Sequence, residues 1–275
     1  MDCPVIQTTP CPTGTKPSAS ASPVHILWTG GWDSTFRVLD LLFRQHRTVQ
    51  PHYLIDPGRP SVGSEIKAMA RMRRRIQDRL PEPHALCPTL FTDEPGIHKN
   101  PDITGAWTTL AARNPLGEQY EWIARYAAMQ GLDNLELSVH IDDRAYLFLD
   151  GHIEEIRDGN SKNYRLKPRD GTDHNLDLVF GRLHFPLLHI SKLDMQAAAD
   201  QAGFRDIMEM TWFCHNPKHG KPCGMCFPCQ FALDEGMARR LPLPARMKCQ
   251  FVSSKPGIVV RSSARKLLRR GQTAR

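Results

Sequence analysis

The sequence predicts an α/β fold with a doubly wound, mainly parallel sheet. Short apolar strands alternate with segments of helical periodicity along most of the chain, which is the pattern that parallel sheets produce. A chain of 275 residues is long enough for one large domain or two small ones, and its 40% hydrophobic and 24% charged content is normal for a globular protein. These observations exclude a fully disordered chain.

Two further classes of protein are excluded by what the sequence lacks. No run approaches the roughly 20 apolar residues that a membrane-spanning helix needs. The N-terminus has neither a basic start nor an apolar core, so it does not resemble a secretory signal. We therefore expect a cytoplasmic protein without a membrane partner, in which the eight cysteines have a chemical role rather than forming disulfides.

The expected elements follow one another from the N-terminus. They are a strand at Val24–Trp28, a helix that begins in the glycine turn 29–35, a strand at His52–Ile55, a helix at Ser64–Leu80, a strand at Leu86–Phe91, a loop rich in Pro, Gly and Asn, a helix at Gln119–Gln130 and a strand at Leu135–Val139. The polar stretch 153–180 predicts an insertion with one or two hairpins. Ser191, followed by Asp194, is typical of a capped helix start.

Composition divides the chain into four segments. A Pro/Ser/Thr-rich leader, 1–22, is expected to be disordered, and the α/β domain spans 23–210. A cysteine-rich segment, 211–245, is expected to pack on that domain, and a basic tail spans 246–275. The formal charge of +7 belongs to the last 25 residues, which hold seven basic residues and no acidic one. Such a tail is either a solvated terminus or a contact for RNA or another polyanion.

A glycine turn joins the first strand to the first helix, with the sequence Thr29-Gly30-Gly31-Trp32-Asp33-Ser34-Thr35. Glycines let the main chain approach a ligand closely, and the free N–H groups and dipole of the following helix attract an anion. The hydroxyls of Thr29, Ser34 and Thr35 add donors. The turn therefore predicts a phosphate site, and the alternative is an ordinary capped turn before a helix. Neither the Walker pattern nor a G-x-G-x-x-G after a strand occurs, which excludes those two kinds of nucleotide site.

Four cysteines lie within sixteen residues in the spacing C-x8-C-x2-C-x2-C, namely Cys214, Cys223, Cys226 and Cys229. Four thiolates fill the tetrahedral shell of Zn²⁺ and leave no open position, so the predicted metal site is structural. An iron–sulfur cluster and a redox dithiol are the alternatives. The other cysteines are scattered and predict no role; they are Cys3, Cys11, Cys87 and Cys249.

The glycine turn resembles the PP-loop signature, S-G-G-x-D-S, of the N-type ATP pyrophosphatase superfamily, with Thr29 in place of the first Ser. The cysteine segment, 211–229, resembles the zinc motif near the C-terminus of one family within it, the 7-cyano-7-deazaguanine synthases. The stretch 185–203 resembles that family's P-L-x-x-x-x-K helix, and Arg113-Asn114 resembles its P-x-R-N segment. The similarity spans residues 24 to 235.

The resemblance implies a PP-loop fold and a ligase that uses ATP and ammonia to convert 7-carboxy-7-deazaguanine to the nitrile, releasing AMP and pyrophosphate. It implies ATP, Mg²⁺ and Zn²⁺ as cofactors. The residues that it places around the pyrophosphate are Thr29, Gly30, Gly31, Ser34 and Thr35. Asp33 would support the loop or the Mg²⁺, and Lys192 would reach a phosphate or be a solvated residue of a first helical turn. Asp33, Ser34 and Lys192 are then the candidate catalytic residues.

The chain departs from this family on the substrate side. The stretch 140–146 stands where a D-x-x-Y-P-D-C-R-like sequence is usual, and Ala111 replaces the proline of P-x-R-N. The candidate substrate residues are Arg113, Asn114, Asp142 and Asp143. The two acids either hydrogen-bond a guanine-like edge or are exposed loop acids. These departures predict a changed carboxylate substrate or a changed nucleophile.

Three functions follow from these observations. The first is an AMP-forming ligase for a deazapurine-like carboxylate and ammonia, with a variant that attaches the activated carboxylate to another amine, for example on a protein. The second is a tRNA-thiolating PP-loop enzyme, which the basic tail would suit and for which Cys87 is the candidate catalytic cysteine. The third is a zinc-stabilised module that binds ATP without turnover. The sequence leaves the oligomeric state open, a homodimer included.

Overall fold

The computed structural model of the chain describes residues 22–140, 143–158, 161–168, 173–234 and 236–253. The predictions for the leader up to residue 21, for Asp142 and for the basic tail from residue 254 lie outside these ranges. Contacts divide the chain into two compact units. Unit 1 comprises Met1–Pro57 and Ala68–Thr211, and unit 2 comprises Gly58–Lys67 and Trp212–Arg275.

Unit 1 contains a five-stranded sheet in which every pairing is parallel. In order across the sheet, its strands are β3 (Leu90–Asp93), β2 (Val49–Ile55), β1 (Val24–Leu27), β4 (Leu135–Glu136) and β7 (Leu183–His184). The α/β class and the parallel sheet are therefore confirmed. The strand order reverses direction at β1, because β2 and β3 extend to one side of it and β4 and β7 to the other.

Several strand bounds differ from the predicted ones. β2 begins three residues earlier than expected, at Val49. β4 has two residues where five were expected, and the short β7 was not predicted at all. β3 begins four residues later than expected, and Leu86 forms an isolated bridge with Val49 instead. Strands this short carry too few residues for their periodicity to stand out from the neighbouring loops.

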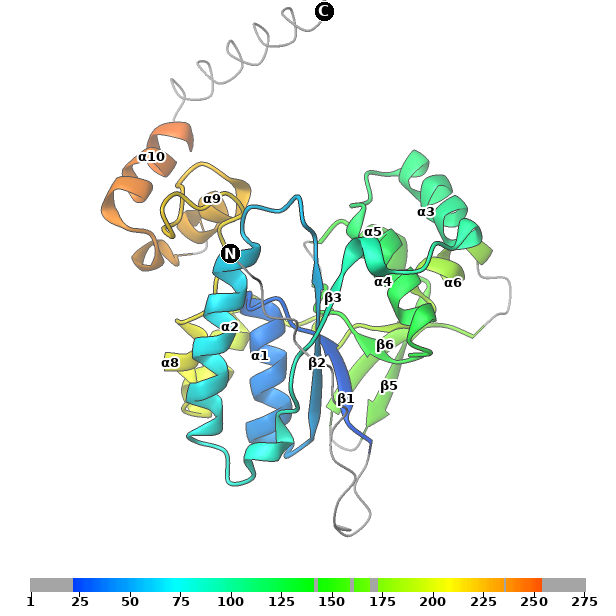
Figure 1. Cartoon of the computed structure of the whole chain (residues 1–275), viewed down its shortest axis with the longest axis horizontal. Coiled ribbons are helices and arrows are strands. Elements are labelled where there is room, and N and C mark those ends of the chain that lie inside the picture. Colours follow the sequence, from blue (N-terminus) through cyan, green and yellow to red (C-terminus); the bar gives the residue numbers. More distant parts are fainter. Residues whose placement is uncertain (1–21, 141–142, 159–160, 169–172, 235, 254–275) are drawn as a thin grey trace, which may run out of the picture. The chain divides into compact units, whose positions relative to one another are not determined.

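Helices cover both sides of the sheet in Figure 1, with α1, α2 and α8 on one side and α3, α4 and α6 on the other. Their bounds are α1 (Trp32–Leu39), the π-helical continuation η1 (Asp40–Arg44), α2 (Val62–Gln77), α3 (Pro101–Arg113), α4 (Gln119–Met129), α5 (Tyr146–Leu149), α6 (His174–Phe180), α7 (Lys192–Gln201) and α8 (Arg205–Met208), with short 3₁₀ turns η2 (Pro83–Ala85) and η3 (Glu94–Gly96). α7 packs on α1 and α8. Ser191 caps α7 with the reciprocal bonds to Asp194 that the sequence predicted.

Helix α3 corrects the prediction of a loop before Gln119. Asn100 caps it by accepting hydrogen bonds from the main-chain N–H groups of Asp102 (3.1 Å) and Ile103 (3.2 Å). Pro101 occupies the first helical position, where its missing N–H costs nothing. The Pro and Asn that suggested a loop are thus the start signal of a helix.

The polar insertion contains one antiparallel hairpin and a helix. The hairpin pairs β5 (Ile153–Asp158) with β6 (Ser161–Leu166), and α6 follows it. Asp173 caps α6 by accepting from the N–H of Asn175 at 2.9 Å. The expectation of at least one hairpin is confirmed.

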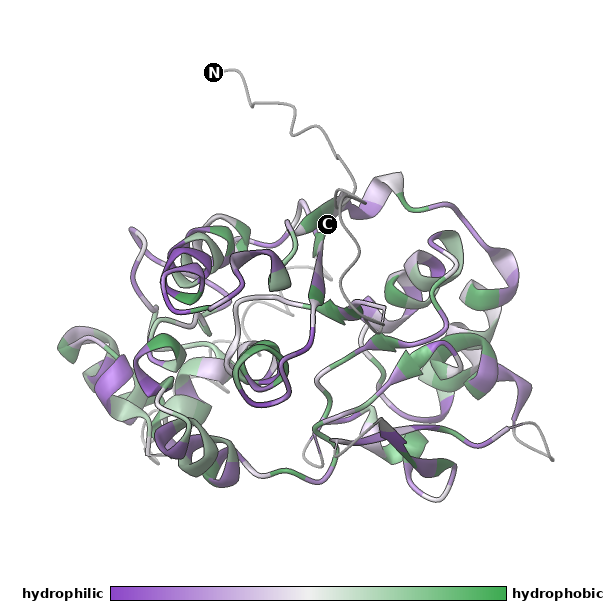
Figure 2. Cartoon of the chain, turned by 90° about the horizontal axis from the view of Figure 1, so that it is seen from below, coloured by the Kyte–Doolittle hydropathy of each residue, from purple (hydrophilic) through white to green (hydrophobic). Residues whose placement is uncertain are grey.

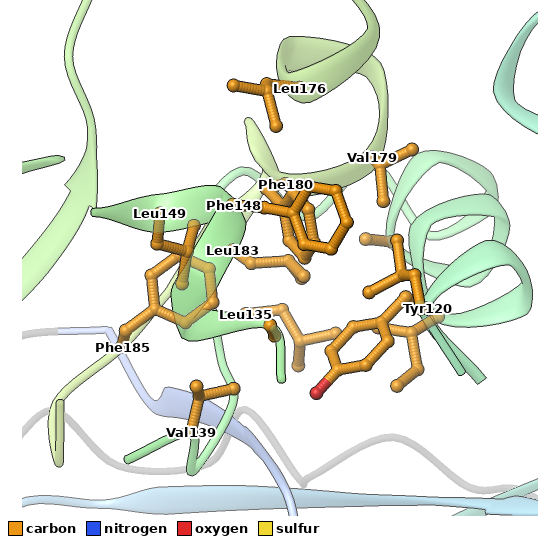
Figure 3. Packing of buried hydrophobic residues seen from close by; sticks show 14 of the residues in the cluster. Tyr120, Leu135, Val139, Phe148, Leu149, Leu176, Val179, Phe180, Leu183 and Phe185 are labelled. Atoms are coloured by element: carbon orange, nitrogen blue, oxygen red, sulfur yellow. The ribbon is translucent and has the colours of Figure 1, made fainter. Parts of the chain in front are cut away.

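The core between the sheet and α4–α6 is aromatic and aliphatic. Figure 3 shows Phe148 and Phe180 on one side of Leu183 and Leu135, the buried leucines of β7 and β4, with Tyr120 beside Leu135. The Phe180 ring lies 5.7 Å from the Tyr120 ring and 6.4 Å from the Phe148 ring, centroid to centroid. These contacts hold β4 and β7 in the core although each strand has only two residues.

A chain of polar side chains crosses the same sheet from strand to helix. His25 Nδ1 lies 2.8 Å from His52 Nε2, and His52 Nδ1 lies 2.7 Å from the Tyr126 hydroxyl. Burial, together with the neighbouring His25, lowers the pKa of His52 to about 3. His52 is therefore neutral at physiological pH and acts as a hydrogen-bonding link.

Unit 2 contains the cysteine segment, α9 (Phe227–Asp234), the 3₁₀ turn η4 (Ala238–Arg240) and α10 (Leu243–Ser253). α9 packs against α10 and η4. In both units the helices alternate hydrophilic and hydrophobic stretches along their length, as the colours of Figure 2 show. Within the described residues, no helix combines the length and the apolar character needed to cross a membrane.

Candidate functional site

The glycine turn lies at the carboxyl end of β1, where the strand order reverses between β1 and β4. In open α/β sheets, ligands bind outside the carboxyl ends of the strands at such a switch point. The sequence predicted a phosphate site here from the residue types of the turn and from its position between a strand and a helix. The topology adds an independent reason to expect a ligand at the same place.

The turn has the backbone that a glycine pair allows. Gly30 has φ +70°, in the left-handed region, and Gly31 is the extended N-cap of α1 with φ −76° and ψ 171°. Gly31 has no side chain with which to cap the helix, so the first N–H groups of α1 lack a capping side chain. A side chain at residue 30 would be strained there by about 1–2 kcal/mol.

Ser34 and Thr29 lie on the two sides of this turn. Ser34 is 6% exposed, and its hydroxyl lies 3.3 Å from both the main-chain nitrogen and the hydroxyl of Thr29. Thr29 itself is exposed. The two hydroxyls therefore meet at one point, directly after β1, where a phosphate oxygen could accept from both.

Thr35 does not contribute a hydroxyl to this point, which corrects its place in the predicted set. It is fully buried, and its hydroxyl accepts from Trp28 Nε1 at 2.9 Å and donates to Met72 Sδ at 3.9 Å. Its main-chain N–H donates to Gly31 O at 3.1 Å. Thr35 therefore anchors α1 to the core beneath the turn.

Asp33 and Lys192 begin two neighbouring helices. Asp33 lies in the first turn of α1 and is half-buried. Lys192 is the first residue of α7, also half-buried, and α7 packs on α1. A carboxylate in the first turn of a helix interacts favourably with the helix dipole.

Ser138 is a site residue that the sequence reasoning missed. It follows β4 by two residues, so it lies past the carboxyl end of the strand that pairs with β1, at the same edge of the sheet as the glycine turn. There the N–H of Val139 donates to Leu137 O at 2.9 Å, which bends the chain at Ser138. Its buried hydroxyl has no hydrogen-bond partner among the described residues. The sequence did not point to it, because the predicted strand, Leu135–Val139, includes Ser138, whereas β4 ends at Glu136.

Arg113 and Asn114, the predicted substrate residues, lie at the end of α3. Arg113 is half exposed and forms an ion pair with Asp173, which lowers the pKa of that carboxyl. Asn114 is the exposed C-terminal cap of α3. The guanidinium of Arg113 is thus paired with Asp173, the residue that caps α6.

Asp143 is half-buried, not the exposed acid of the alternative interpretation. One of its carboxylate oxygens accepts from the Tyr120 hydroxyl at 2.9 Å and from the N–H of Ala145 at 3.0 Å. Burial raises the pKa of Tyr120, and the nearby Asp143 raises it further, so the phenol stays protonated as the donor. The interaction holds the start of α5 against α4.

The four cysteines of unit 2 converge on one point. Their sulfur atoms all lie within 4.8 Å of one another, and Cys214 and Cys229 are fully buried. Cys226 Sγ lies 3.9 Å from Cys214 Sγ and 3.5 Å from Cys229 Sγ. A tetrahedral zinc with Zn–S bonds of about 2.3 Å requires sulfur separations of about 3.8 Å. The group could therefore hold a metal ion such as zinc.

The main chain around the cysteines forms tight turns. Between Cys214 and Cys223, a two-residue hairpin at His219 (φ +50°) and Gly220 (φ +71°) joins Lys218 to Lys221. The N–H of Cys223 donates to Cys214 Sγ at 3.2 Å, and the N–H of Met225 donates to Cys223 Sγ at 3.3 Å. These donors favour negatively charged sulfur.

The thiols of the cluster differ in pKa. The hydrogen bond from Cys229 lowers the pKa of Cys226 to about 4, whereas burial raises the pKa of Cys214 to about 11. Metal ligation requires all four as thiolates, so a bound cation would compensate the cost of burying their charge.

Comparison of the chain with models of known protein families found no match, and comparison with curated proteins found none either.

Proposed function

We propose that the protein is an ATP-dependent, AMP-forming ligase that activates a deazapurine-like carboxylate for attack by ammonia. The observation that carries the proposal is the pairing of the PP-loop-like turn with the switch point. A left-handed glycine, two meeting hydroxyls and the buried hydroxyl of Ser138 all lie at the one edge of the sheet where this fold class binds ligands. The resemblance of both sequence motifs to 7-cyano-7-deazaguanine synthases supplies the reaction.

The chemistry divides into two adenylations. A carboxylate is a poor electrophile, so its oxygen first attacks the α-phosphorus of ATP, forming an acyl adenylate and releasing pyrophosphate. Ammonia then attacks the acyl carbon, giving the amide with loss of AMP and a proton. A second ATP adenylates the amide oxygen and releases a second pyrophosphate, and loss of AMP and of both amide protons leaves the nitrile.

The residues of the turn would bind and orient the departing pyrophosphate. The main-chain N–H groups at Gly30 and Gly31, with the hydroxyls of Thr29 and Ser34, would donate to its oxygens. Lys192 would add a positive charge from α7. Asp33 would hold a Mg²⁺ ion, which supplies charge neutralisation between the phosphates.

The altered substrate side favours a second candidate, in which another amine, for example on a protein, replaces ammonia. Asp143 uses one carboxylate oxygen to hold Tyr120 and Ala145, so it is committed to the structure of its loop rather than free to bind substrate with both oxygens. Thiolation of tRNA is less well supported, because Cys87 is 1% exposed and cannot act on a macromolecule.

The test is to incubate the full chain with ATP, Mg²⁺, ammonia and 7-carboxy-7-deazaguanine, and to measure AMP, pyrophosphate and the mass of the product. We expect AMP to form only when the carboxylate is present. The variants Ser34→Ala and Asp33→Ala should reduce AMP formation by about 100-fold or more while circular dichroism stays unchanged. The matched control is Ser64→Ala, a helix serine outside the turn.

Each other result assigns a different function. AMP formed from the carboxylate but joined to an added amine or protein would select the second candidate. AMP formed only with tRNA would select thiolation. Tight ATP binding without AMP under any condition would select a binding module, and unchanged turnover in both turn variants would remove the phosphate assignment.

A further inference from the structure

A second site lies at the far end of α1 from the glycine turn. A cavity of about 710 Å³ in unit 1 is lined by the end of α1, by η1, by β6 and by the loop that follows β7. From Asp33 to Arg44 a helix rises about 16 Å, so this cavity is well separated from the turn. Its polar and aromatic lining includes Asp40, Arg44, Lys162, Tyr164 and His189.

The cavity is built on an unusual helix. Between Asp40 and Arg44 the chain is π-helical, with the N–H of Gln45 donating to Asp40 O at 3.1 Å. His46 then takes a left-handed conformation, φ +51°, which is uncommon for a residue other than glycine. Short π-helical segments are rare and often occur at functional sites, because they project side chains in directions that an α-helix does not allow.

Asp40 holds the basic groups of the cavity in place. Its two carboxylate oxygens accept from Arg44 Nη1 at 2.6 Å, from Gln45 Nε2 at 2.5 Å and from Arg37 Nη1 at 3.2 Å. Arg37 lines the cavity but is committed to the structure, since it also donates two hydrogen bonds to the carboxylate of Glu136, at 2.8 and 2.7 Å. Arg44 is different, because its side chain is 49% exposed. Asp40 thus orients Arg44 without burying it.

Lys162 adds a second accessible cation from β6. It pairs with Glu155 at 3.2 Å, but the lysine side chain is 60% exposed and the glutamate 35%. Exposed ion pairs of this kind contribute little free energy, so an incoming anion can displace Glu155 from Lys162 easily. Arg47 also lines the cavity, which makes four cations against the single carboxylate of Asp40 among its lining residues.

Another part of the lining is aromatic and apolar. The rings of Tyr164 and His189 meet edge to face with centroids 4.8 Å apart, and Leu187 and Ile190 continue this wall. A flat ring can pack against such a surface, while a charged group on the same molecule would reach the cations.

We propose that this cavity binds a small aromatic anion, with its phosphate or carboxylate held by Arg44 and Lys162 and its ring against Tyr164. The pairing of oriented but exposed cations with an aromatic wall distinguishes it from an ordinary basic surface. This site is independent of the proposed ligase activity.

The experiment is isothermal titration calorimetry of the full chain with phenyl phosphate and with benzoate, using inorganic phosphate and phenol as the separate halves. We expect saturable one-site binding of at least one aromatic anion, tighter than either of its halves. Arg44→Gln and Lys162→Gln should each raise the Kd about tenfold or more. The matched control is Arg157→Gln, because Arg157 also pairs with Glu155 on the same hairpin but does not line the cavity.

The outcomes separate the site from general electrostatic attraction. Unchanged binding in Arg157→Gln, together with weakened binding in the two cavity variants, supports the proposal. Equal weakening in all three variants overturns it, as does the lack of saturable binding of both aromatic anions in the millimolar range. Tighter binding of phenyl phosphate than of benzoate assigns a phosphate ligand, and the reverse assigns a carboxylate. Each variant is first checked for an unchanged melting temperature.

Discussion

The glycine turn of unit 1 and the cysteine cluster of unit 2 are both short motifs, but they prepare for a ligand in different ways. The cluster uses side chains that already point at one another, with all four sulfurs within 4.8 Å. The turn would bind a ligand mainly through main-chain N–H groups, and its only paired side chains are the hydroxyls of Thr29 and Ser34, 3.3 Å apart. A closed set of ligands stabilises the fold that carries it, whereas an open set is available for a substrate. Loss of a residue should therefore affect stability at the cluster and activity at the turn.

The largest expected effect is at the cluster. Cys226→Ser should lose the bound metal and the solubility of the protein together, because the metal provides folding free energy to a segment with little core of its own. Metal analysis and a solubility assay measure both. Cys249→Ser is the control, since Cys249 is a fully buried cysteine of unit 2 that is not one of the four converging cysteines. Less than about half an equivalent of metal in the wild type would contradict the four-thiolate assignment.

A second test compares two glycines of unit 2. Gly224 and Gly220 have nearly the same left-handed φ, +72° and +71°, but a Cβ on Gly224 would lie 2.1 Å from Ala245 O of α10, whereas nothing is near Gly220. Gly220→Ala should cost about 1–2 kcal/mol of unfolding free energy for its backbone alone. Gly224→Ala should cost clearly more, since main chain must move. Equal losses in urea unfolding would show that α10 does not approach the cysteine turn this closely.

At the turn we expect the opposite of the cysteine cluster, namely a loss of ligand affinity without a loss of stability. Ser138→Ala removes a buried hydroxyl that has no partner among the described residues, so the free energy of unfolding should stay the same or rise slightly. If ATP or the carboxylate bonds this hydroxyl, its affinity should fall about five- to tenfold. Calorimetric binding and thermal unfolding measure the two quantities. A loss of stability with unchanged affinity would place Ser138 with the structural residues.

The smallest expected effect is a decrease in the free energy of unfolding at acid pH. An unfolded chain takes up a proton on His52 near pH 6.5, whereas the folded chain does so only near pH 3, so the free energy of unfolding falls as the pH drops through this window. Between pH 7 and pH 6 the loss should be about 0.7 kcal/mol. His52→Gln should remove this part of the pH dependence, and His152→Gln, an exposed control, should not. Identical slopes in all three proteins would show that His52 titrates normally.

The same contrast explains what the sequence could predict. Cysteine spacing predicted the ligand set, because thiols separated by two residues on a turn can converge on one metal ion. The strand–turn–helix passage and the start of α7 were also predictable, since Gly30, Gly31 and the Ser191–Asp194 pair have local causes. Thr35 was misassigned because its partners, Trp28 and Met72, are set by tertiary packing. Ser138 and the cavity at η1 depend on which segments become neighbours, which no local pattern records.

The brevity of β4 has a consequence for how the protein can change. Beyond Glu136 the chain leaves the ladder, and Leu137 retains a single main-chain bond to His184 at 2.8 Å before the segment that carries Val139 and Asp143. Among the described residues 137–140, substitutions disturb few sheet hydrogen bonds, while β1 pairs with a strand on each side. If the protein has the proposed function, a change of acceptor would therefore need substitutions at one rim of the sheet only, and the turn proposed to bind the nucleotide would stay as it is.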